Sequence, residues 1–357
     1  MNDILEVLKK LEEKGFMAYF VGGYPRDLYL GIDTIDYDIT TNATPKEMME
    51  IFNVKSEAYG CVKFTYKKNK FEATTFRRDI KYKDNRKPVE IEYVNDLETD
   101  LERRDFTINT LCIDSDGNYI DLLNGKKDID NKIIKVVGNT NKKLKDDALR
   151  ILRAIRFATV LNFKLDKTLI EGIKKYGYLV RELSYDRKKS ELDKIFSSNN
   201  FEYGIKLIKE LDLESPLEIN TYNLKYTPYL VGVWAQINSP NYNFNKAEET
   251  TIKKVKELLN MDITDKMVIY KYGLYPISIA ADIKGIDINI INDVYKKLNI
   301  KSRNDIDINA KEICTILKIE PSEIISDILS NLEYKIVNDE LENRKDIIVK
   351  YLEEAYL

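Results

Sequence analysis

The sequence of 357 residues contains no histidine, only three cysteines and a single tryptophan. Without histidine, the chain has no imidazole to act as general base, to activate a nucleophile or to bind a metal. The cysteines Cys61, Cys112 and Cys314 lie far apart. We expect them to pack in the core rather than form a disulfide or a zinc site. Any chemistry therefore relies on carboxylates, on lysine and arginine, and on metals bound through oxygen.

A large excess of charge and long apolar runs are also missing. The formal net charge is -3, so binding of RNA or DNA would depend on local clusters of Lys and Arg. No apolar stretch approaches the ~18 residues that a membrane span needs, and the start "MNDILEVLKK" has no secretory pattern. We expect a cytoplasmic protein that does not contact a membrane.

The composition predicts a globular chain of two or more domains, because hydrophobic residues make up 43% and charged residues 33%. The N-terminal part, up to about Gly138, mixes helices and strands, and the pattern from Asp146 onward is helical. In the N-terminal part we predict a helix, a strand, a short helix, a strand and two hairpins, at residues 3–14, 17–21, 25–30, 36–40, 62–76 and 111–123.

The stretch "FVGGYPRDLYLGIDTIDYDIT", from Phe20 to Thr40, concentrates residues able to do chemistry. Asp36 and Asp38 are separated by one residue on the predicted strand, so their side chains leave the same face. Such a pair can hold one or two divalent cations, and oxygen ligands favour Mg²⁺ or Mn²⁺. Alone, however, the pattern is more often found at solvent-facing edges of strands, and this is the alternative.

Glycines precede these acids at the start of the predicted short helix. Gly22 and Gly23 leave backbone amides bare for the approach of phosphate oxygens, and Arg26 adds a guanidinium. A tight turn in which Arg26 pairs with Asp27 is the alternative. Glu72, on a later strand, is the best candidate for a third acid, or else an exposed strand residue.

Four segments in this order resemble the class II tRNA nucleotidyltransferases, which comprise the CCA-adding enzymes and bacterial poly(A) polymerases. The segments are "VGGYPRD…DYDIT", "ATTFRRD", "RRDFTIN" and "DDALRILRAIRFA". The resemblance implies an α+β head with a mixed sheet, followed by an all-α neck, body and tail. We place these domains at residues 1–138, 139–197, 198–300 and 301–357, with tRNA binding in the tail.

The resemblance also implies roles for individual residues. Asp36 and Asp38 would carry the catalytic metals, and Gly22, Gly23 and Arg26 would serve the triphosphate. The segment "RRDFTIN" would line the same cleft near the incoming nucleotide, with Arg104, Asp105 and Asn109.

A base-reading pair is expected where the helical region begins. Asp147 and Arg150 are three residues apart on a predicted helix and so lie side by side. A carboxylate acceptor beside a guanidinium donor matches the pairing edges of cytosine and adenine and clashes with those of guanine and uracil. The family assigns the corresponding residues this role. Arg153 and Arg156 continue the basic row toward phosphates or neighbouring acids.

Other segments support these expectations. In "SYDRKKSELDKIF", Arg187 and Glu191 are expected to brace the base-reading helix. Residues 76–93 resemble the full-length flexible loop of the family. RNA would bind through helical lysines such as Lys142, Lys143, Lys188 and Lys189.

The predicted function is addition of CCA to the 3′ end of tRNA from CTP and ATP, with no obligate protein partner implied. The alternatives are a poly(A) polymerase, an enzyme that adds only the A or only the two C residues, and a non-catalytic RNA-binding protein.

Overall fold

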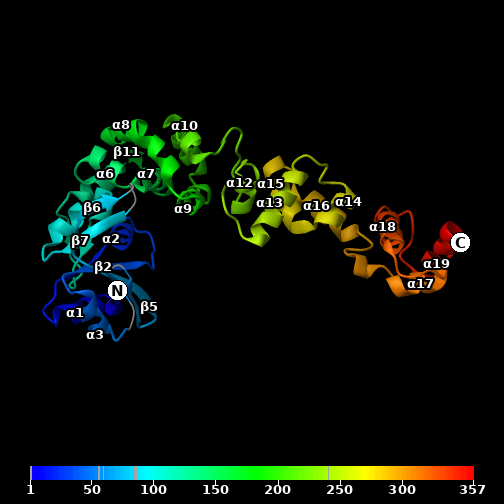
Figure 1. The fold of residues 1–357 in the computed structure, drawn as a ribbon, viewed down its shortest axis with the longest axis horizontal. Coiled ribbons are helices and arrows are strands. Elements are labelled where there is room, and N and C mark those ends of the chain that lie inside the picture. Colours follow the sequence, from blue (N-terminus) through cyan, green and yellow to red (C-terminus); the bar gives the residue numbers. More distant parts are fainter. Residues whose placement is uncertain (1, 55–56, 59, 84–86, 240) are drawn as a thin grey trace. The chain divides into compact units, whose positions relative to one another are not determined.

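The chain folds into two compact units, Met1–Thr221 and Tyr222–Leu357. Figure 1 shows the computed structural model, in which an N-terminal sheet is followed by helices. Among the residues that the structure describes, no helix is both long and apolar enough to cross a membrane. These residues are 2–54, 57–58, 60–83, 87–239 and 241–357.

A seven-stranded mixed sheet forms the centre of the N-terminal part, in the order β3-β4-β5-β2-β1-β8-β9. The neighbours β2 and β5 run parallel, and the other pairs are antiparallel. The strands span Ala18–Val21 (β1), Tyr37–Thr41 (β2), Glu57–Ala58 (β3), Cys61–Tyr66 (β4), Asn69–Thr75 (β5), Cys112–Ile113 (β8) and Tyr119–Ile120 (β9).

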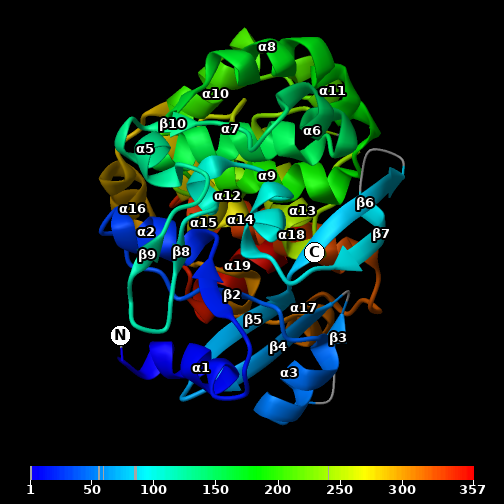
Figure 2. The same cartoon turned by 90° about the vertical axis from the view of Figure 1, so that its left-hand side faces the viewer.

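One face of this sheet is covered by two helices, α1 (Asn2–Glu12) and α3 (Pro45–Phe52). They lie on the same side of β4 and β5 in Figure 2. Their apolar side chains share a core with Tyr37, Ile39, Phe64, Phe71 and other strand residues. Because side chains alternate along a strand, Asp38 and Glu72 leave the opposite face, which carries the polar residues.

The sequence patterns predicted these elements closely, with informative shifts. Helix α2 (Gly23–Tyr29) begins two residues before the predicted start at Pro25, within the glycine pair. Strand β2 begins at Tyr37, so Asp36 precedes the strand rather than lying in it. Both predicted hairpins are present, as β4–β5 and β8–β9.

A two-stranded antiparallel ribbon, β6 (Arg77–Lys83) and β7 (Lys87–Tyr93), projects beside the sheet. It occupies most of residues 76–93, which we expected to be a flexible loop. Residues 84–86 of that expectation lie outside the described part of the chain. Helix α4 (Leu97–Glu102) and the 3₁₀ turn η1 (Thr107–Asn109) follow the ribbon.

The rest of the N-terminal unit is mainly helical, as expected. A short parallel pair of strands interrupts it, β10 (Ile133–Ile134) with β11 (Lys164–Leu165). The helical segments are α5 (Gly125–Asp130), α6 (Thr140–Asp146), α7 (Leu149–Leu161), α8 (Lys167–Tyr176), η2 (Gly177–Glu182), α9 (Tyr185–Phe196), α10 (Phe201–Glu210) and α11 (Glu214–Leu217).

The second unit is helical throughout its described elements and has its own core. Isoleucine and leucine side chains from successive helices, among them Ile277, Ile313 and Leu332, are fully buried there. Its elements are α12 (Leu230–Ala235), α13 (Lys246–Leu258), α14 (Lys266–Tyr272), α15 (Leu274–Lys284), α16 (Ile288–Lys297), η3 (Arg303–Asp305), α17 (Ala310–Leu317), α18 (Glu323–Val337) and α19 (Lys345–Tyr356). The boundaries at 138, 197 and 300 stay predictions.

Candidate active site

The glycine turn and the second acid meet at the end of strand β1. Val21 pairs with Asp38 across the β1–β2 ladder, so the turn that follows β1 lies beside the Asp38 carboxylate. Gly22 has φ +81°, and a Cβ atom built on it would be 3.2 Å from Asp38 Oδ2. Only glycine fits both the backbone conformation and this approach without strain. The turn therefore brings bare backbone to within contact of the acid.

Asp38 lies in a row of charged side chains that crosses three strands. Asp38 on β2 pairs in register with Glu72 on β5, and Glu72 pairs with Lys63 on β4. These three residues and Asp36 line an open pocket of about 500 Å³. The structure thus brings together the three acids expected from the sequence, although Asp36 reaches the pocket from the segment before β2.

The negative charges in this pocket are incompletely balanced. Asp38 opens to the pocket, but surrounding protein atoms desolvate its carboxylate, and the charge of Glu72 adds to this effect, which raises the pKa of Asp38 to about 6. Burial also acts to raise the pKa of Glu72, yet hydrogen bonds from Lys63 and Cys61 lower it overall. The Lys63 ammonium lies 2.7 Å from Glu72 Oε2.

These donors fit a magnesium-type ion held jointly with a phosphate ligand. Mg²⁺ is usually bound by one or two carboxylates together with substrate phosphates and water, and Asp36 and Asp38 offer two carboxylates facing one open pocket. The described part of the chain contains no cluster of three or more acids, cysteines or histidines arranged to hold a metal alone. The site therefore matches a shared protein–nucleotide site better than a closed protein cage.

A chain of buried polar contacts runs from the glycine turn to helix α7. Arg26 donates to Asn109 Oδ1 at 2.6 Å and to Asp27 Oδ1 at 2.8 Å. Asn109 donates to Asp105 Oδ1 at 3.2 Å, and Arg153 of α7 donates to Asp105 Oδ2 at 2.6 Å. Burial alone would raise the pKa of Asp105, but the charge and hydrogen bond of Arg153 lower it to about 2. Four of the predicted nucleotide-binding residues thus form one connected network.

The aromatic ring of Phe157 joins the same network. The guanidinium carbons of Arg26, Arg153 and Arg156 lie 5.2, 5.2 and 4.0 Å from its centroid. Each arginine also pairs with a carboxylate, so the ring sits among three neutralised cations. The sequence analysis missed Phe157, because a phenylalanine at a helical core position carries no specific signal.

The position of Asp147 differs from the prediction. We expected Asp147 and Arg150 on one helix face, but Asp147 has extended backbone (φ -147°, ψ 105°) between α6 and α7. Its carboxylate accepts a hydrogen bond from the Leu149 amide at 3.1 Å and lies 3.4 Å from the Arg187 guanidinium. Asp favours such positions because its side chain bonds nearby backbone amides. Desolvation raises the pKa of Asp147, against the charge of Arg187.

Arg150 is placed next to this bend, in the first turn of α7. Its side chain is buried and donates to the carbonyl oxygen of Lys143 at 2.7 Å.

The contacts expected from Arg187 and Glu191 of α9 to the base-reading segment are confirmed. Arg187 contacts Asp147, and Glu191 contacts Arg156 with 2.6 Å between Oε2 and Nε. Helix α9 thus holds both ends of the segment that bears the candidate base-reading residues.

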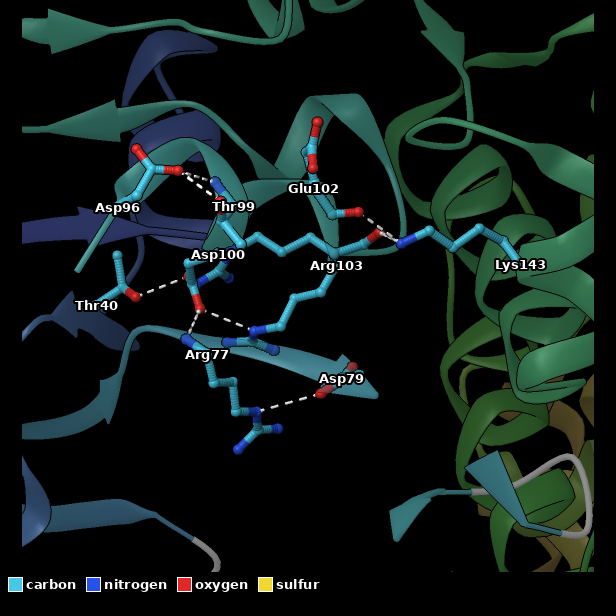
Figure 3. A network of polar contacts seen from close by, with 10 residues as sticks. Thr40, Arg77, Asp79, Asp96, Thr99, Asp100, Glu102, Arg103 and Lys143 are labelled. Atoms are coloured by element: carbon cyan, nitrogen blue, oxygen red, sulfur yellow. Dashed lines mark hydrogen bonds and ion pairs between the residues drawn. The ribbon is translucent and has the colours of Figure 1, made fainter. Parts of the chain in front are cut away.

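Arg104 belongs to a second network, centred on the fully buried carboxylate of Asp100 (Figure 3). Asp100 accepts hydrogen bonds from Thr40 Oγ1 of β2 at 2.9 Å, the Arg77 amide at 3.2 Å, Arg103 Nε at 2.8 Å and an Arg104 terminal nitrogen at 3.2 Å. This single carboxylate ties strand β2, the base of the β6–β7 ribbon and α4 together. The sequence analysis missed it, although an acid three and four residues before two arginines was a visible signal.

The comparisons with known proteins agree with this geometry. Family models match three segments: a poly A polymerase head domain (residues 18–135), a probable RNA- and SrmB-binding site of polymerase A (162–218) and a putative tRNA nucleotidyltransferase domain 2 (236–352). A CCA-adding enzyme of Ligilactobacillus salivarius is 33% identical over 391 residues, covering 97% of this chain and 94% of the relative. The chain belongs to the CCA-adding enzyme family.

Solved structures of CCA-adding enzymes share the fold. The Bacillus stearothermophilus CCA-adding enzyme in complex with CTP is 26% identical, with a TM-score of 0.84 over 99% of this chain and 96% of that chain. The Thermotoga maritima CCA-adding enzyme complexed with tRNA has 20% identity and a TM-score of 0.69, with 99% and 94% covered. The α+β head followed by helical regions, predicted from the sequence, is therefore confirmed.

Two of the lysines expected to bind RNA have structural roles in this family member. Lys143 Nζ donates to the backbone carbonyls of Glu102 and Arg104 (Figure 3), and burial, followed by the charge of Arg150, lowers its pKa to about 8. Lys188 is fully buried and donates to the Arg181 carbonyl. The sequence analysis assigned both to RNA binding because they are lysines of predicted helices.

Proposed function

We propose that this protein adds C, C and A to the 3′ end of tRNA, using CTP and ATP and releasing pyrophosphate. Two observations carry the proposal. The chain is 33% identical to a CCA-adding enzyme over 97% of its length. The glycine turn lies against Asp38, and Asp38 lines a pocket together with Asp36 and Glu72. Because CTP, ATP and tRNA are intracellular, we also propose that the protein works in the cytoplasm.

In this proposal, Asp36 and Asp38 would hold Mg²⁺ or Mn²⁺. The bound ions would lower the pKa of the RNA 3′-hydroxyl and offset the negative charge that develops on the phosphates. Gly22 and Gly23 present backbone amides to the triphosphate, and the positive φ of Gly22 keeps that backbone beside Asp38. The charge of Arg104 already acts to lower the pKa of Asp38, so we assign Arg104 to the same cleft.

The polar chain from Arg26 to Arg153 would hold the parts of this site in register. Asp105 and Asn109 connect the α2 turn to α7 through hydrogen bonds of 2.6–3.2 Å. Since Arg26 and Asp105 are engaged with protein partners, we assign them to the nucleotide cleft as positioning residues. Arg156, paired with Glu191 against the Phe157 ring, fixes α7 from the other side.

Base selection is assigned to Asp147 and Arg150. Cytosine and adenine each offer an amine beside an unprotonated ring nitrogen, so a carboxylate and a guanidinium satisfy both groups. Guanine and uracil would leave one buried group on each side unpaired, at about 1–3 kcal/mol per group. The bend at Asp147 supports this role, because the Asp147 carboxylate there is desolvated and is braced by the Arg187 guanidinium at 3.4 Å.

The test is an incorporation assay with Mg²⁺ and a tRNA that lacks its 3′ CCA. Labelled CTP, ATP, GTP and UTP are supplied singly and as CTP plus ATP, and the products are resolved to one nucleotide. A three-nucleotide ladder that needs both CTP and ATP is expected. A long ladder from ATP alone would identify a poly(A) polymerase, and addition of only the A or only two C residues a partial enzyme. No addition would leave an RNA-binding protein.

A further inference from the structure

We propose that Lys63 and Lys70 bind backbone phosphates at the 3′ end of the RNA primer, on the flank of the site opposite the glycine turn. The inference rests on the proposed function and adds to it the path by which the RNA end reaches the acids. Both lysines line the pocket with Asp36, Asp38 and Glu72.

Strand order separates two flanks around the catalytic strand. β2 lies between β1, which leads into the Gly22 turn, and β5, which is followed outward by β4. Neighbouring strands are about 4.8 Å apart, so Lys63 and Lys70 on β4 and β5 occupy a region distinct from the turn. One flank offers backbone amides next to Asp38, and the other offers two ammonium groups.

The lysines leave the face of the sheet that carries the acids. On β4, Lys63 and Thr65 are exposed and Phe64 between them is buried. On β5, Lys70 pairs with Thr65 and Glu72 pairs with Lys63. The 2.7 Å contact to Glu72 holds the Lys63 ammonium in the row that contains Asp38, and an ammonium has two further donors for a phosphate.

The direction of the reaction assigns the flank to the primer. In phosphoryl and nucleotidyl transfer, the attacking oxygen and the leaving group lie roughly in line, on opposite sides of the phosphorus. If the triphosphate lies against the Gly22 turn, the 3′-hydroxyl arrives from the β5–β4 side. An RNA strand there would meet three carboxylates, so cations on that flank are needed to offset the repulsion.

The experiment measures tRNA binding in EDTA, where no metal and no turnover contribute. The variants are Lys63→Met, Lys70→Met and the double variant, and the control is Lys46→Met, an exposed lysine on α3, which covers the opposite face of the sheet. Each variant is tested with a tRNA that lacks CCA and with one shortened by three further 3′ nucleotides. A Lys63→Arg/Lys70→Arg variant keeps the charges and controls for folding.

The double variant should bind the tRNA with the longer end more weakly than the unmodified protein does. The magnitude of its slope of log K against log salt should be smaller by about 1.4, because each of two lost single-strand phosphate contacts contributes about 0.7. The double variant should bind the shortened tRNA with the affinity of the unmodified protein. The Lys46→Met control should bind both tRNAs with that unchanged affinity. The Arg double variant should retain full affinity.

Equal losses with both tRNAs, or none with either, would overturn the proposal. A raised KM for CTP with unchanged tRNA affinity would also overturn it and would assign the lysines to the triphosphate. Failure of the proposed function is a separate result, because it appears as absence of C and A addition by the unmodified protein, whatever its affinity for tRNA.

Discussion

Removing the charge of Asp100 tests whether one buried carboxylate holds the catalytic strand, the ribbon and α4 together. Asp100 Oδ1 accepts from the Arg77 amide and Arg103 Nε, and Oδ2 accepts from Thr40 and Arg104. In Asp100→Asn, one oxygen becomes an NH₂ group that faces two donors. The variant therefore loses two hydrogen bonds to a charged carboxylate, one from a guanidinium and one from a neutral donor.

The expected loss in the free energy of unfolding is about 3–6 kcal/mol, from about 1.5–3 kcal/mol for each of the two hydrogen bonds to a charged group. The matched control is Asp96→Asn. Asp96 caps the same helix by accepting from the Thr99 amide at 2.8 Å, and Asn caps as well as Asp. The control should stay within about 0.5 kcal/mol of the unmodified protein.

Urea unfolding followed by far-UV circular dichroism measures the stability of both variants, and hydrogen exchange of peptides that contain Arg77 measures the local effect.

The stabilisation by Asp100 should also depend on pH. Burial alone would raise the pKa of Asp100, but the charges of Arg104 and Arg103 lower it. Its stabilisation is therefore full above the unfolded value of about 3.9 and disappears as pH falls through the lower folded pKa. The difference between the variant and the unmodified protein should narrow in that acid range. A loss below about 0.5 kcal/mol at pH 7, or a difference that does not depend on acid pH, would refute the reasoning.

Two further predictions concern the catalytic turn and base selection. Gly22→Ala and Gly15→Ala both put an L residue at positive φ (+81° and +86°) and should each cost about 1–2 kcal/mol of stability. Only the new methyl group at Gly22 would press on Asp38, so the kcat of the Gly22 variant should fall by up to about 100-fold. The Gly15 variant should keep its kcat. Equal kcat values for the two variants in a steady-state assay would contradict this prediction. Asp147→Ala should reduce the ratio of kcat/KM for CTP to that for UTP by roughly 5- to 100-fold, from about 1–3 kcal/mol per unpaired group. Asp146→Asn, one residue away, should leave the ratio unchanged, and an unchanged ratio in both variants would remove Asp147 from base reading.

The predictable part of the fold follows from local periodicity. Alternating residues gave β4 and β5, glycine gave the turns, and the amphipathic pattern gave α1, because these signals lie within a few residues of one another. The pocket was predicted in part for the same reason: Asp36 and Asp38 are neighbours in the sequence. Pairing of Asp38 with Glu72, 34 positions later, depends on parallel pairing of β2 with β5, which no local pattern encodes.

The misplaced residues share one physical cause, which is that side chains of the same type serve solvent, backbone and ligand equally well. Asp147 was assigned to a helix because D-x-x-R fits helical spacing, but its carboxylate bonds the Leu149 amide and the chain bends there. Lys143 was assigned to RNA, but its ammonium satisfies two backbone carbonyls after α4. For Asp147 the competing partner is a backbone amide only two residues away, whereas for Lys143 the tertiary fold brings carbonyls from 41 and 39 positions away.

Lys63 shows how such a competing partner can itself define a function. Its position on β4 would read as an ordinary exposed lysine, since strand alternation puts it on the polar face. Register with Glu72 places its ammonium 2.7 Å from the Glu72 carboxylate, in the row that contains Asp38. A cation at one side of an acidic pocket makes the electrostatic potential differ between the two sides of the pocket. Phosphate groups are attracted to the side with the cation and repelled by the acids. In the proposed reaction, the charge pattern across β2, β5 and β4 would order the substrates together with the acids proposed to hold the metal.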